Sequence, residues 1–295
     1  MPGEFDFIDW IRAQTTRFDH VIVGPGDDLA VLKWNADDLL IVGVDQVLDG
    51  VHFDSALHLP AEIGRKVMNR NLSDCAAMAC LPAAAVATVA LPKFRDIEYA
   101  KDLFRGMKHA AEPFNFPLVG GDTASWDGKL VLTVTILGRS AGVEPVRRSG
   151  AKVGDAIYVT GPLGGSLLGR HMTFTPRIEL ARQLAQQYRI HAMIDISDGL
   201  SRDLRHICQQ SGVGAIIQAD KLPIHDDALS LSRHDRSSPL EHALHDGEDH
   251  ELLLTSNTFI PEATWIGNIV EGDRIMLNTR SGMAPIEPKG WEHRM

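Results

Sequence analysis

Acidic residues stand at positions where an isolated carboxylate has no obvious structural task. Asp45 directly follows the apolar run 39–44, Asp195 follows the apolar run 192–194, and Asp74 lies among small residues in N-L-S-D-C-A-A-M-A. A carboxylate at the end of a buried strand is partly desolvated and faces the crevice where ligands of α/β proteins bind. Several such groups close together repel one another, so they need cations or hydrogen-bond donors nearby.

Further acids occupy glycine-containing segments. They are Asp27 and Asp28 in V-G-P-G-D-D, Asp122 after L-V-G-G, Asp198 in D-I-S-D-G, and Glu248 and Asp249 in H-D-G-E-D-H. Oxygen ligands without cysteine or histidine favour Mg²⁺ over zinc, and carboxylates can hold Mg²⁺ against a nucleotide triphosphate. The structural alternative is that each is a turn former or a helix N-cap. Asp74 has no capping task, and the number of such sites favours the ligand interpretation.

The glycine-rich segment 161–169 also allows two interpretations. It lacks the Lys-Ser/Thr pair of a Walker A loop and does not match G-x-G-x-x-G. Its backbone amides could bind a phosphate, or its glycines could only permit a tight, closely packed turn. Cys75, Cys80 and Cys208 stand in apolar helical contexts and are expected in the core.

The composition excludes several classes of protein. Asp and Glu total 39 against 29 Lys and Arg, a net charge of −10, which argues against nucleic-acid binding. A hydrophobic fraction of 44% excludes wholesale disorder. The three cysteines are too few for a disulfide framework, and no apolar run approaches the ~20 residues of a membrane span. We therefore expect a cytoplasmic globular protein with no nucleic-acid or membrane partner.

Strands alternate with helices in both halves, which indicates an α/β architecture. The pattern predicts helices at 5–16, 61–79, 97–111 and 200–210, another after the glycine turn, and strands at 39–44, 85–91, 130–137, 156–160, 192–196 and 265–270. The segment 138–155 is rich in Gly, Arg, Ser and Pro. We expect the domain boundary there, with an N-terminal domain at 1–140 and a C-terminal domain at 141–295.

Seven motifs occur in the order found in thiamine-monophosphate kinases, a family within the larger group typified by aminoimidazole ribonucleotide synthetase. They are G-P-G-D-D, V-D-Q-V-L-D-G-V-H-F, N-L-S-D-C-A-A-M, V-G-G-D-T, R-R-S-G-A-K-V-G-D, I-D-I-S-D-G-L and D-G-E-D-H-E-L. The resemblance covers nearly the whole chain. It implies a two-domain α/β fold with mixed sheets, like that of aminoimidazole ribonucleotide synthetase. The N-terminal domain would bind ATP and Mg²⁺ and pair across a homodimer, and the C-terminal domain would complete the cleft.

The resemblance also implies an activity, the ATP-dependent phosphorylation of thiamine monophosphate to thiamine diphosphate by direct in-line transfer with several Mg²⁺ ions. By the same resemblance the metal ligands are Asp28, the Val44 carbonyl, Asp45, Asp74, Asp122, Asp195 and, for an outlying metal, Asp198. The nucleotide contacts are Gly121, Asp122, Arg148 and Ser197, and the substrate contacts are His52, Glu248 and Trp291. The chain departs from the family pattern at Gly43, Asp246 and His250, where serine, glycine and tyrosine are usual.

Two other functions use part of the same motifs. A related ATP-dependent synthetase is one, although a selenophosphate synthetase needs an early Cys or selenocysteine and none precedes Cys75, while a hydrogenase-maturation member needs a terminal Cys and the sequence ends Glu-His-Arg-Met. A non-catalytic nucleotide sensor is the other. Clustered acids without a ligand would only destabilise such a protein. A kinase is the interpretation that uses all of the motifs.

Overall fold

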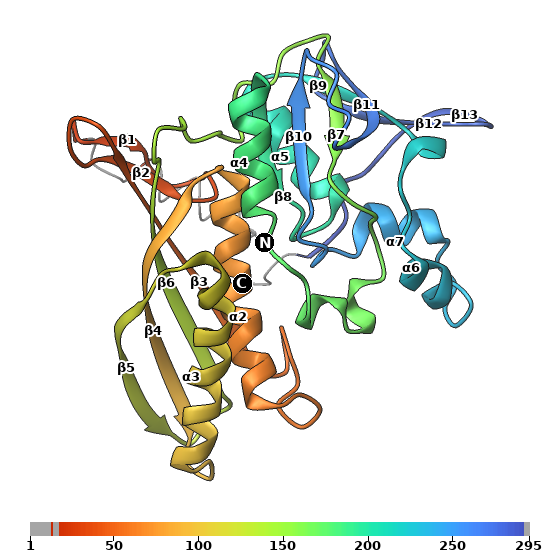
Figure 1. Ribbon diagram of the computed structural model, residues 1–295. Coiled ribbons are helices and arrows are strands. Elements are labelled where there is room, and N and C mark those ends of the chain that lie inside the picture. The colour runs from red at the N-terminus through yellow and green to blue at the C-terminus, as the bar shows by residue number, and fades with distance from the viewer. Residues whose placement is uncertain (1–12, 14–17, 292–295) are drawn as a thin grey trace.

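The computed structural model describes residue 13 and residues 18–291. The helix predicted at 5–16 lies, apart from Ala13, outside the described residues. The chain forms two lobes, each built on one mixed sheet (Figure 1). Among the residues described, no helix is long and apolar enough to cross a membrane.

The first lobe contains a six-stranded sheet in the order β1-β2-β3-β6-β4-β5. Its strands are β1 (Val21–Val23), β2 (Ala30–Lys33), β3 (Leu39–Leu48), β4 (Leu81–Pro92), β5 (Leu118–Trp126) and β6 (Val131–Arg139). Neighbouring strands are antiparallel except β4 and β5, which are parallel. Alternate residues of β6, Leu132, Val134 and Ile136, are buried in the core, as the period of a strand requires.

Two helices, α2 (Pro60–Ala77) and α3 (Ile97–Ala111), pack on this sheet and on each other. Pro60 starts α2, where a missing N–H costs nothing, and the Asp96 carboxylate caps α3 by accepting from the Tyr99 N–H at 2.9 Å. The helices cross at Gly64 and Gly106. A Cβ on Gly64 would lie 2.0 Å from the Leu103 carbonyl oxygen, so the close crossing requires glycine.

The second lobe contains a seven-stranded sheet in the order β13-β12-β9-β11-β7-β10-β8. Its elements are β7 (Ala156–Val159), α4 (Ile178–Gln187), β8 (Ile190–Asp195), α5 (Leu200–Ser211), β9 (Gly214–Gln218), α6 (Asp226–Leu231), α7 (Pro239–His245), β10 (Leu252–Ser256), β11 (Thr264–Val270), β12 (Ile275–Thr279) and β13 (Gly282–Pro285). The β12–β13 hairpin has no counterpart in the sequence prediction. The helix predicted after the glycine turn is wrong, because short 3₁₀ turns at Ser166–Leu168 and Arg170–Met172 occupy that segment.

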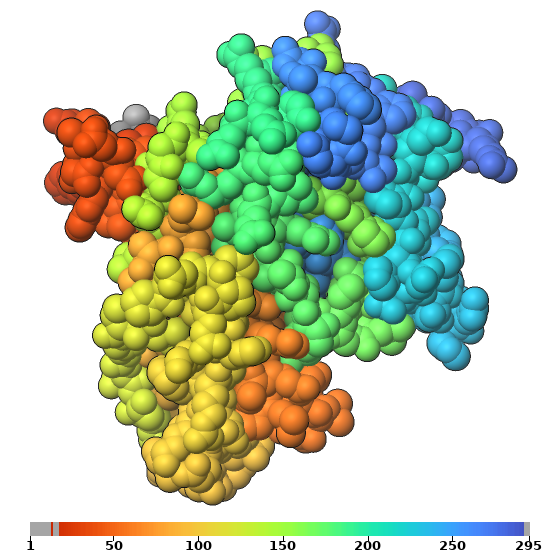
Figure 2. All heavy atoms as spheres, viewed as in Figure 1, coloured from red at the N-terminus to blue at the C-terminus, as the bar shows by residue number. Residues whose placement is uncertain are grey.

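One apolar core joins the two lobes. It includes Leu72 of α2 together with Ile178 and Leu184 of α4 and Leu254 of β10. Figure 2 shows α4 against the first lobe, with the surface continuous between the two. Because this core is shared, β3 and α2 are held in a fixed position relative to β8 and the loop that precedes β10, and the candidate site lies among these elements.

Candidate functional site

Three carboxylates predicted as metal ligands meet where the lobes join. Asp28 lies in the turn before β2, Asp74 on α2, and Asp195 at the end of β8. Their ligand oxygen atoms all lie within 4.8 Å of one another. We call these three residues the acidic group. Both lobes contribute to it, so it forms only when the chain is fully folded.

The charges of the acidic group are only partly compensated by basic side chains among the described residues. The Asp28 side chain is fully buried; its Oδ1 accepts from Nη2 of Arg148 at 2.7 Å, while its Oδ2 is buried and has no hydrogen-bond partner among the described residues. Burial raises the pKa of Asp28 to about 7 despite Arg148. Burial, reinforced by Asp45 and Asp195, also raises the pKa of Asp74 well above its usual range. An unsatisfied, all-oxygen donor set of this kind fits a hard cation such as Mg²⁺.

Asp195 is the best-supported member of the acidic group. Its Oδ2 accepts from the Ser73 hydroxyl at 2.5 Å and lies 3.2 Å from Nδ1 of His250. Burial would raise the pKa of Asp195, but these contacts outweigh it and lower the pKa. The His250 ring in turn stacks on Phe174 with 4.0 Å between centroids. His250, where the family usually has tyrosine, is therefore part of the support of a predicted ligand.

A second cluster of charges faces the same junction. Lys66, Arg70 and Asp74 follow one another at spacings of four on α2, so they share one face of the helix. Arg70 Nε donates to Asp45 Oδ2 at 2.8 Å, and its Nη1 donates to Glu248 Oε1 at 2.6 Å. Lys66 Nζ donates to Glu248 Oε2. The site therefore contains a basic cluster, which we define as Lys66, Arg70 and His171, around a single glutamate.

The basic cluster outweighs the effect of burial on the pKa of Glu248. Lys66 is fully buried, and its Nζ lies 2.6 Å from Nδ1 of His171. Burial would raise the pKa of Glu248, but Arg70, His171 and Lys66 hold it well below its usual range. Desolvation lowers the pKa of Lys66, and Glu248 opposes that effect. Glu248 is thus an ionised carboxylate.

The loop that carries Glu248 has an uncommon backbone. Glu248 has φ 54° and His250 has φ 52°, in the left-handed region that residues other than glycine rarely adopt. The Glu248 N–H donates to the Ser197 carbonyl at 2.7 Å, and the His250 N–H donates to the Ile196 carbonyl at 2.8 Å. Such strain persists where neighbouring contacts enforce it, and it clusters at functional sites. Here the two backbone hydrogen bonds hold the loop in this conformation, and Glu248 contacts Lys66 and Arg70 of α2.

Two further predicted substrate residues are neighbours. The rings of His52 and Trp291 lie 6.3 Å apart between centroids, inclined at 57°. His52 Nδ1 accepts from the Leu48 N–H at 3.1 Å, and the Trp291 N–H donates to the Asp198 carbonyl at 3.1 Å. Trp291 is therefore tied to the loop after β8 and lies beside His52 of the first lobe.

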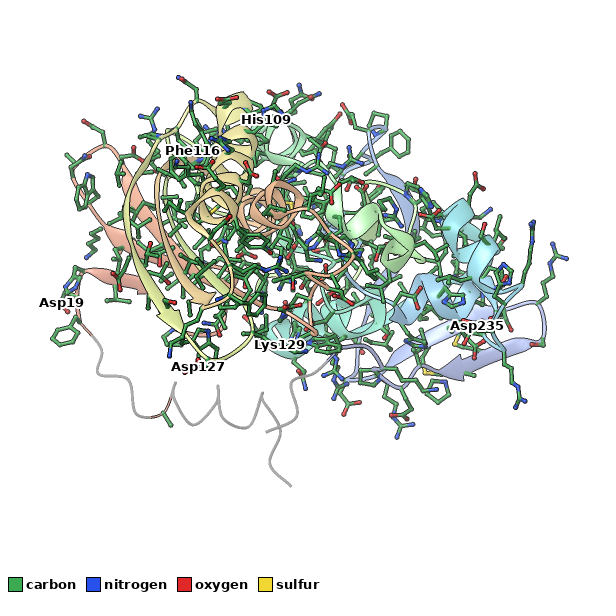
Figure 3. The ribbon with its side chains drawn as sticks, turned by 90° about the horizontal axis from the view of Figure 1, so that it is seen from below. Asp19, His109, Phe116, Asp127, Lys129 and Asp235 are labelled. Atoms are coloured by element: carbon green, nitrogen blue, oxygen red, sulfur yellow. The ribbon has the colours of Figure 1, made fainter. Side chains whose placement is uncertain are left out.

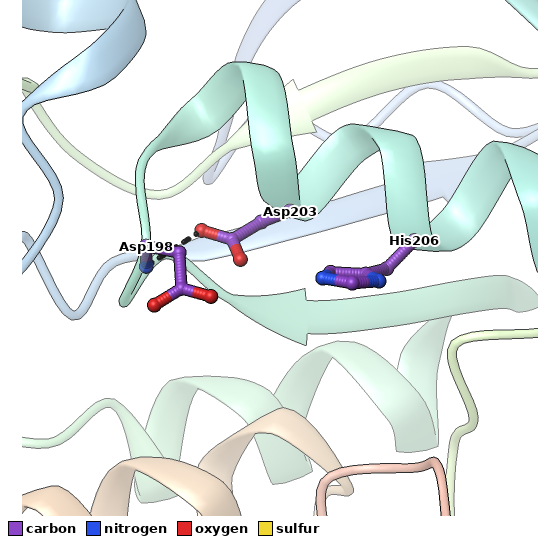
Figure 4. A group of neighbouring side chains, drawn as sticks. All are labelled: Asp198, Asp203 and His206. Atoms are coloured by element: carbon purple, nitrogen blue, oxygen red, sulfur yellow. Dashed lines mark hydrogen bonds between the residues drawn. The ribbon is translucent and has the colours of Figure 1, made fainter. Parts of the chain in front are cut away.

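Asp198 belongs to a different group from Asp195. Ligand atoms of Asp198, Asp203 and His206 lie within 4.8 Å of one another at the start of α5 (Figure 4). Asp203 Oδ2 accepts from the Asp198 N–H at 3.2 Å. Burial, with the charge of Asp198 added, raises the pKa of Asp203 well above its usual range. The prediction named Asp198 and Ser197 here but missed Asp203 and His206, which follow at helical spacing.

Two predicted residues lie away from the acidic group of the same chain. Gly121 and Asp122 are on β5 at the edge of the first sheet, and they are exposed. In register, Asp45 pairs with Val134 of β6, which pairs with Ala87 of β4, which pairs with Gly121. Three strand spacings separate Asp45 from Gly121, about 14 Å. Their predicted roles need a ligand that extends this far or a second chain.

Asp45 and Val44 are placed differently from expectation. The strand predicted to end at Val44 continues to Leu48, so Asp45 lies within β3 and not after it. β2 pairs with β3 only as far as Val42, which leaves the edge of β3 open at Val44 and Asp45.

A side chain at Gly43, where serine is usual in the family pattern, would clash with the core. A Cβ on Gly43 would lie 2.0 Å from Cδ2 of Leu29, a buried residue, so Leu29 occupies the space that a serine would need.

The glycine-rich turn is structural in this fold. The Gly164 N–H donates to the Asp249 carboxylate at 3.0 Å, and the Gly165 N–H donates to Asp246 Oδ2 at 2.8 Å. These amides are occupied by carboxylates of the chain itself, so the tight-turn interpretation holds for them. Asp246, a departure from the family pattern, therefore holds the glycine-rich turn through the Gly165 N–H. The three cysteines are buried, as predicted.

The fold and the site define a class. The family profile described as AIR synthase related protein, N-terminal domain, matches residues 26–140, and the profile described as AIR synthase related protein, C-terminal domain, matches residues 152–276. A thiamine-monophosphate kinase from Rhodopirellula baltica is 42% identical, covering 85% of this chain and 81% of the relative. One from Aquifex aeolicus is 32% identical, covering 99% and 98%. The chain belongs to the thiamine-monophosphate kinase family.

Solved structures agree with this placement. The structure described as AaThiL complexed with AMPPCP and TMP has a TM-score of 0.86 at 31% identity and covers 99% of this chain and 97% of its own. A thiamine-monophosphate kinase from Stenotrophomonas maltophilia has a TM-score of 0.74 at 32% identity, covering 93% and 96%. The predicted family and the predicted two-domain mixed α/β fold are confirmed.

Proposed function

We propose that this chain transfers the γ-phosphoryl group of ATP to thiamine monophosphate and forms thiamine diphosphate. An oxygen of the acceptor phosphate forms a bond to the γ-phosphorus while the bond from that phosphorus to the β–γ bridging oxygen breaks, and ADP leaves. The observation that carries the proposal is the acidic group, whose buried Asp28 Oδ2 has no hydrogen-bond partner among the residues that the structure describes. It lies beside a separate Glu248 whose two oxygens are both paired.

The acidic group is where Mg²⁺ would be held, by Asp28, Asp74 and Asp195, with Asp45 and the Val44 carbonyl at the open edge of β3 nearby. Bound Mg²⁺ would neutralise phosphate oxygens and the charge that develops during transfer. Asp198, with Asp203 and His206, is proposed to hold an outlying metal. The carboxylates are already fixed by folding, so they are in place before the ligand arrives.

Different residues are proposed to bind the nucleotide and the acceptor. Arg148 keeps 21% of its side-chain surface exposed beside Asp28, which suits a nucleotide phosphate contact, and Ser197 is proposed to contact the nucleotide too. Glu248, whose carboxylate is held in place by Lys66 and Arg70, is proposed to contact the acceptor, and the His52 and Trp291 rings offer aromatic surface to this cationic ligand. In this proposal residues 1–140 bind ATP and Mg²⁺, and residues 141–295 complete the cleft.

A homodimer would explain the placement of Gly121 and Asp122. β5 is an edge strand, and Val119 and Trp126 on it are 60% and 45% exposed. Figure 3 shows Phe116, just before β5, and Asp127, just after it, on opposite sides of the first lobe, so this edge runs the length of the lobe. Long exposed edges invite pairing with another chain. We infer that a second copy packs against β5, so that Asp122 of one copy lies at the acidic group of the other.

A direct assay tests the activity. Purified protein with Mg-ATP should release ADP and form thiamine diphosphate from thiamine monophosphate, and should act little on thiamine or on an aminoimidazole ribonucleotide precursor. Product identity is checked by chromatography. Turnover of another acceptor in place of thiamine monophosphate would support the synthetase alternative. Nucleotide binding with no turnover of any acceptor would support the sensor.

Complementation tests the dimer. Asp74→Asn and Asp122→Asn should each be inactive as homodimers. Mixed after subunit exchange, they should recover about one quarter of wild-type activity, because half of the dimers are mixed and each then has one intact site. An active monomer by light scattering, or no recovery in mixed dimers shown by a tag, would contradict a shared site.

A further inference from the structure

Arg70 is the cation that joins the two halves of the site. Its Nε donates to Asp45 of β3, in the first lobe, and its Nη1 donates to Glu248, in the second lobe. The side chain is 15% exposed, so it is mostly buried but still reaches solvent. Among the described residues, the third nitrogen, Nη2, has no hydrogen-bond partner. The guanidinium is thus held in place by two bonds and has one donor group left.

The position of that donor group matters for phosphoryl transfer. On one side of Arg70 lie Asp45 and Asp74, where the nucleotide is proposed to bind, and Asp74 is close enough to interact with the Arg70 charge. On the other side lies Glu248, proposed to face the acceptor. The reacting oxygen of the acceptor must lie between the nucleotide and the rest of the acceptor. In this site the acceptor's reacting group is itself a phosphate, so two anions must be brought together.

We propose that Arg70 binds the phosphate of the acceptor through Nη2 and is the residue that selects a phosphorylated acceptor. This inference rests on the proposed function. A guanidinium is a planar fork that binds carboxylate and phosphate oxygens through several parallel donors, and its positive charge is permanent. Its charge offsets the repulsion between the acceptor phosphate and the γ-phosphate. Arg70 gives up no proton in this role.

Lys66 does not duplicate Arg70. Its side chain is fully buried, and its ammonium already contacts Glu248 and His171. It therefore continues to hold Glu248 when Arg70 is replaced. This separation makes Arg70 testable, because its removal does not leave Glu248 without a cation.

The test compares ligands with and without a phosphate in proteins with and without Arg70. Equilibrium binding of thiamine monophosphate and of thiamine is measured by calorimetry for wild type, Arg70→Gln and Arg70→Lys. In Arg70→Gln, thiamine monophosphate should bind roughly 10- to 150-fold more weakly, the value of a charged hydrogen bond, while thiamine binding stays within about twofold. Arg70→Lys should recover part of the loss, since it keeps the charge without the fork.

Arg65→Gln is the matched control. Arg65 is on the same helix, and its Nη2 donates to the Met172 carbonyl at 2.8 Å. This variant should bind both ligands as wild type does. If Arg70→Gln weakens both ligands equally, Arg70 only supports the fold of the pocket and the inference is wrong. Unchanged binding of thiamine monophosphate also overturns it.

The inference and the proposed function fail in different ways. A wild-type protein that neither binds nor phosphorylates thiamine monophosphate overturns both. A wild type that phosphorylates it, with Arg70 variants that still prefer the phosphorylated ligand, overturns the role of Arg70 alone. Should Arg70→Gln fold poorly by thermal melting, Arg70→Lys decides: a loss confined to thiamine monophosphate supports the inference, and an equal loss for both ligands contradicts it.

Discussion

The acidic group and the surroundings of Glu248 both lie mostly out of contact with solvent, but they are electrostatically opposite. At the acidic group, burial raises the pKa of Asp28 and Asp74, and Asp28 Oδ2 is left without a partner among the residues described. At Glu248, the same burial is outweighed by Arg70, His171 and Lys66, and the pKa falls. In the part of the chain that the structure describes, the acidic group has fewer basic partners than carboxylates, whereas Glu248 alone is contacted by several basic side chains.

This difference indicates which region waits for a ligand. Clustered carboxylates without counter-charges destabilise a folded chain, and a bound cation removes that cost. Stabilisation by metal and nucleotide should therefore arise at the acidic group, since ligand-linked stability follows affinity for the folded state. Glu248 is already stabilised before any ligand binds.

Asp74→Asn should have the largest effect. It removes one charge from the acidic group while keeping the shape of the side chain. We expect kcat to fall at least about 10³-fold, equivalent to ~4 kcal/mol of barrier. Without metal, the variant should melt at or above the wild-type temperature, because like-charge repulsion is relieved. Activity assays and thermal melts with and without Mg-ATP measure both effects.

Asp45→Asn is the comparison variant. Asp45 is also a predicted metal ligand, so activity should again fall, but it pairs with Arg70 and its loss should lower the melting temperature of the metal-free protein. Opposite shifts in the two variants would support the contrast between the two regions. If Asp74→Asn instead melts early without metal, Asp74 is a structural hydrogen-bond acceptor and the contrast is wrong.

Glu248→Gln should act mainly on stability. It leaves the Lys66 ammonium buried with His171 and without its carboxylate. Breaking a buried ion pair from one side is strongly destabilising, so we expect the free energy of unfolding to fall by about 3 kcal/mol. Denaturant titration of the metal-free protein measures this. A variant as stable as wild type would show that Glu248 is not needed to compensate Lys66.

Much of the fold could be predicted because it depends on local patterns. The predicted helix at 97–111 matches α3, and the strand predicted at 192–196 is present as β8, which ends at Asp195. The shape of the first sheet could not be predicted, because strand order depends on pairings far apart in the chain. For that reason no pattern in the sequence indicates that Asp122 lies on an edge strand, separated from Asp45 by β6 and β4.

The prediction named the acids of the candidate site but missed its basic cluster. The motifs named Asp28, Asp74 and Asp195, which the structure brings together. Lys66 and Arg70 were overlooked, although their spacing of four from Asp74 places them on the same helix face. A lysine and an arginine on a helix usually point to solvent. Only the packing of the second lobe on α2 buries Lys66 and makes it a partner of Glu248.

The stability of the metal-free protein should depend on pH through Asp28. In the folded state Asp28 keeps its proton up to about pH 7, whereas an unfolded aspartate loses it near ~3.9. Between these values the folded state binds more protons, so the free energy of unfolding should fall as pH rises, by at most ~1.4 kcal/mol per pH unit. Denaturant titrations of wild type and Asp28→Asn at several pH values measure the difference. If both show the same slope, Asp28 does not titrate in this range.

Trp291→Ala should have the smallest effect and should separate binding from transfer. Trp291 is 46% exposed, and its side chain is near His52 while its backbone N–H holds the Asp198 carbonyl. Alanine keeps that backbone bond and removes only the ring. A ring against a cationic ligand contributes about 0.5–2 kcal/mol, so KM for thiamine monophosphate should rise roughly 3- to 30-fold while kcat and KM for ATP change little. Steady-state kinetics with each substrate varied measure the three constants. A fall in kcat as large as the rise in KM would mean that the ring also orients the acceptor for transfer, and an unchanged KM would remove Trp291 from the acceptor site.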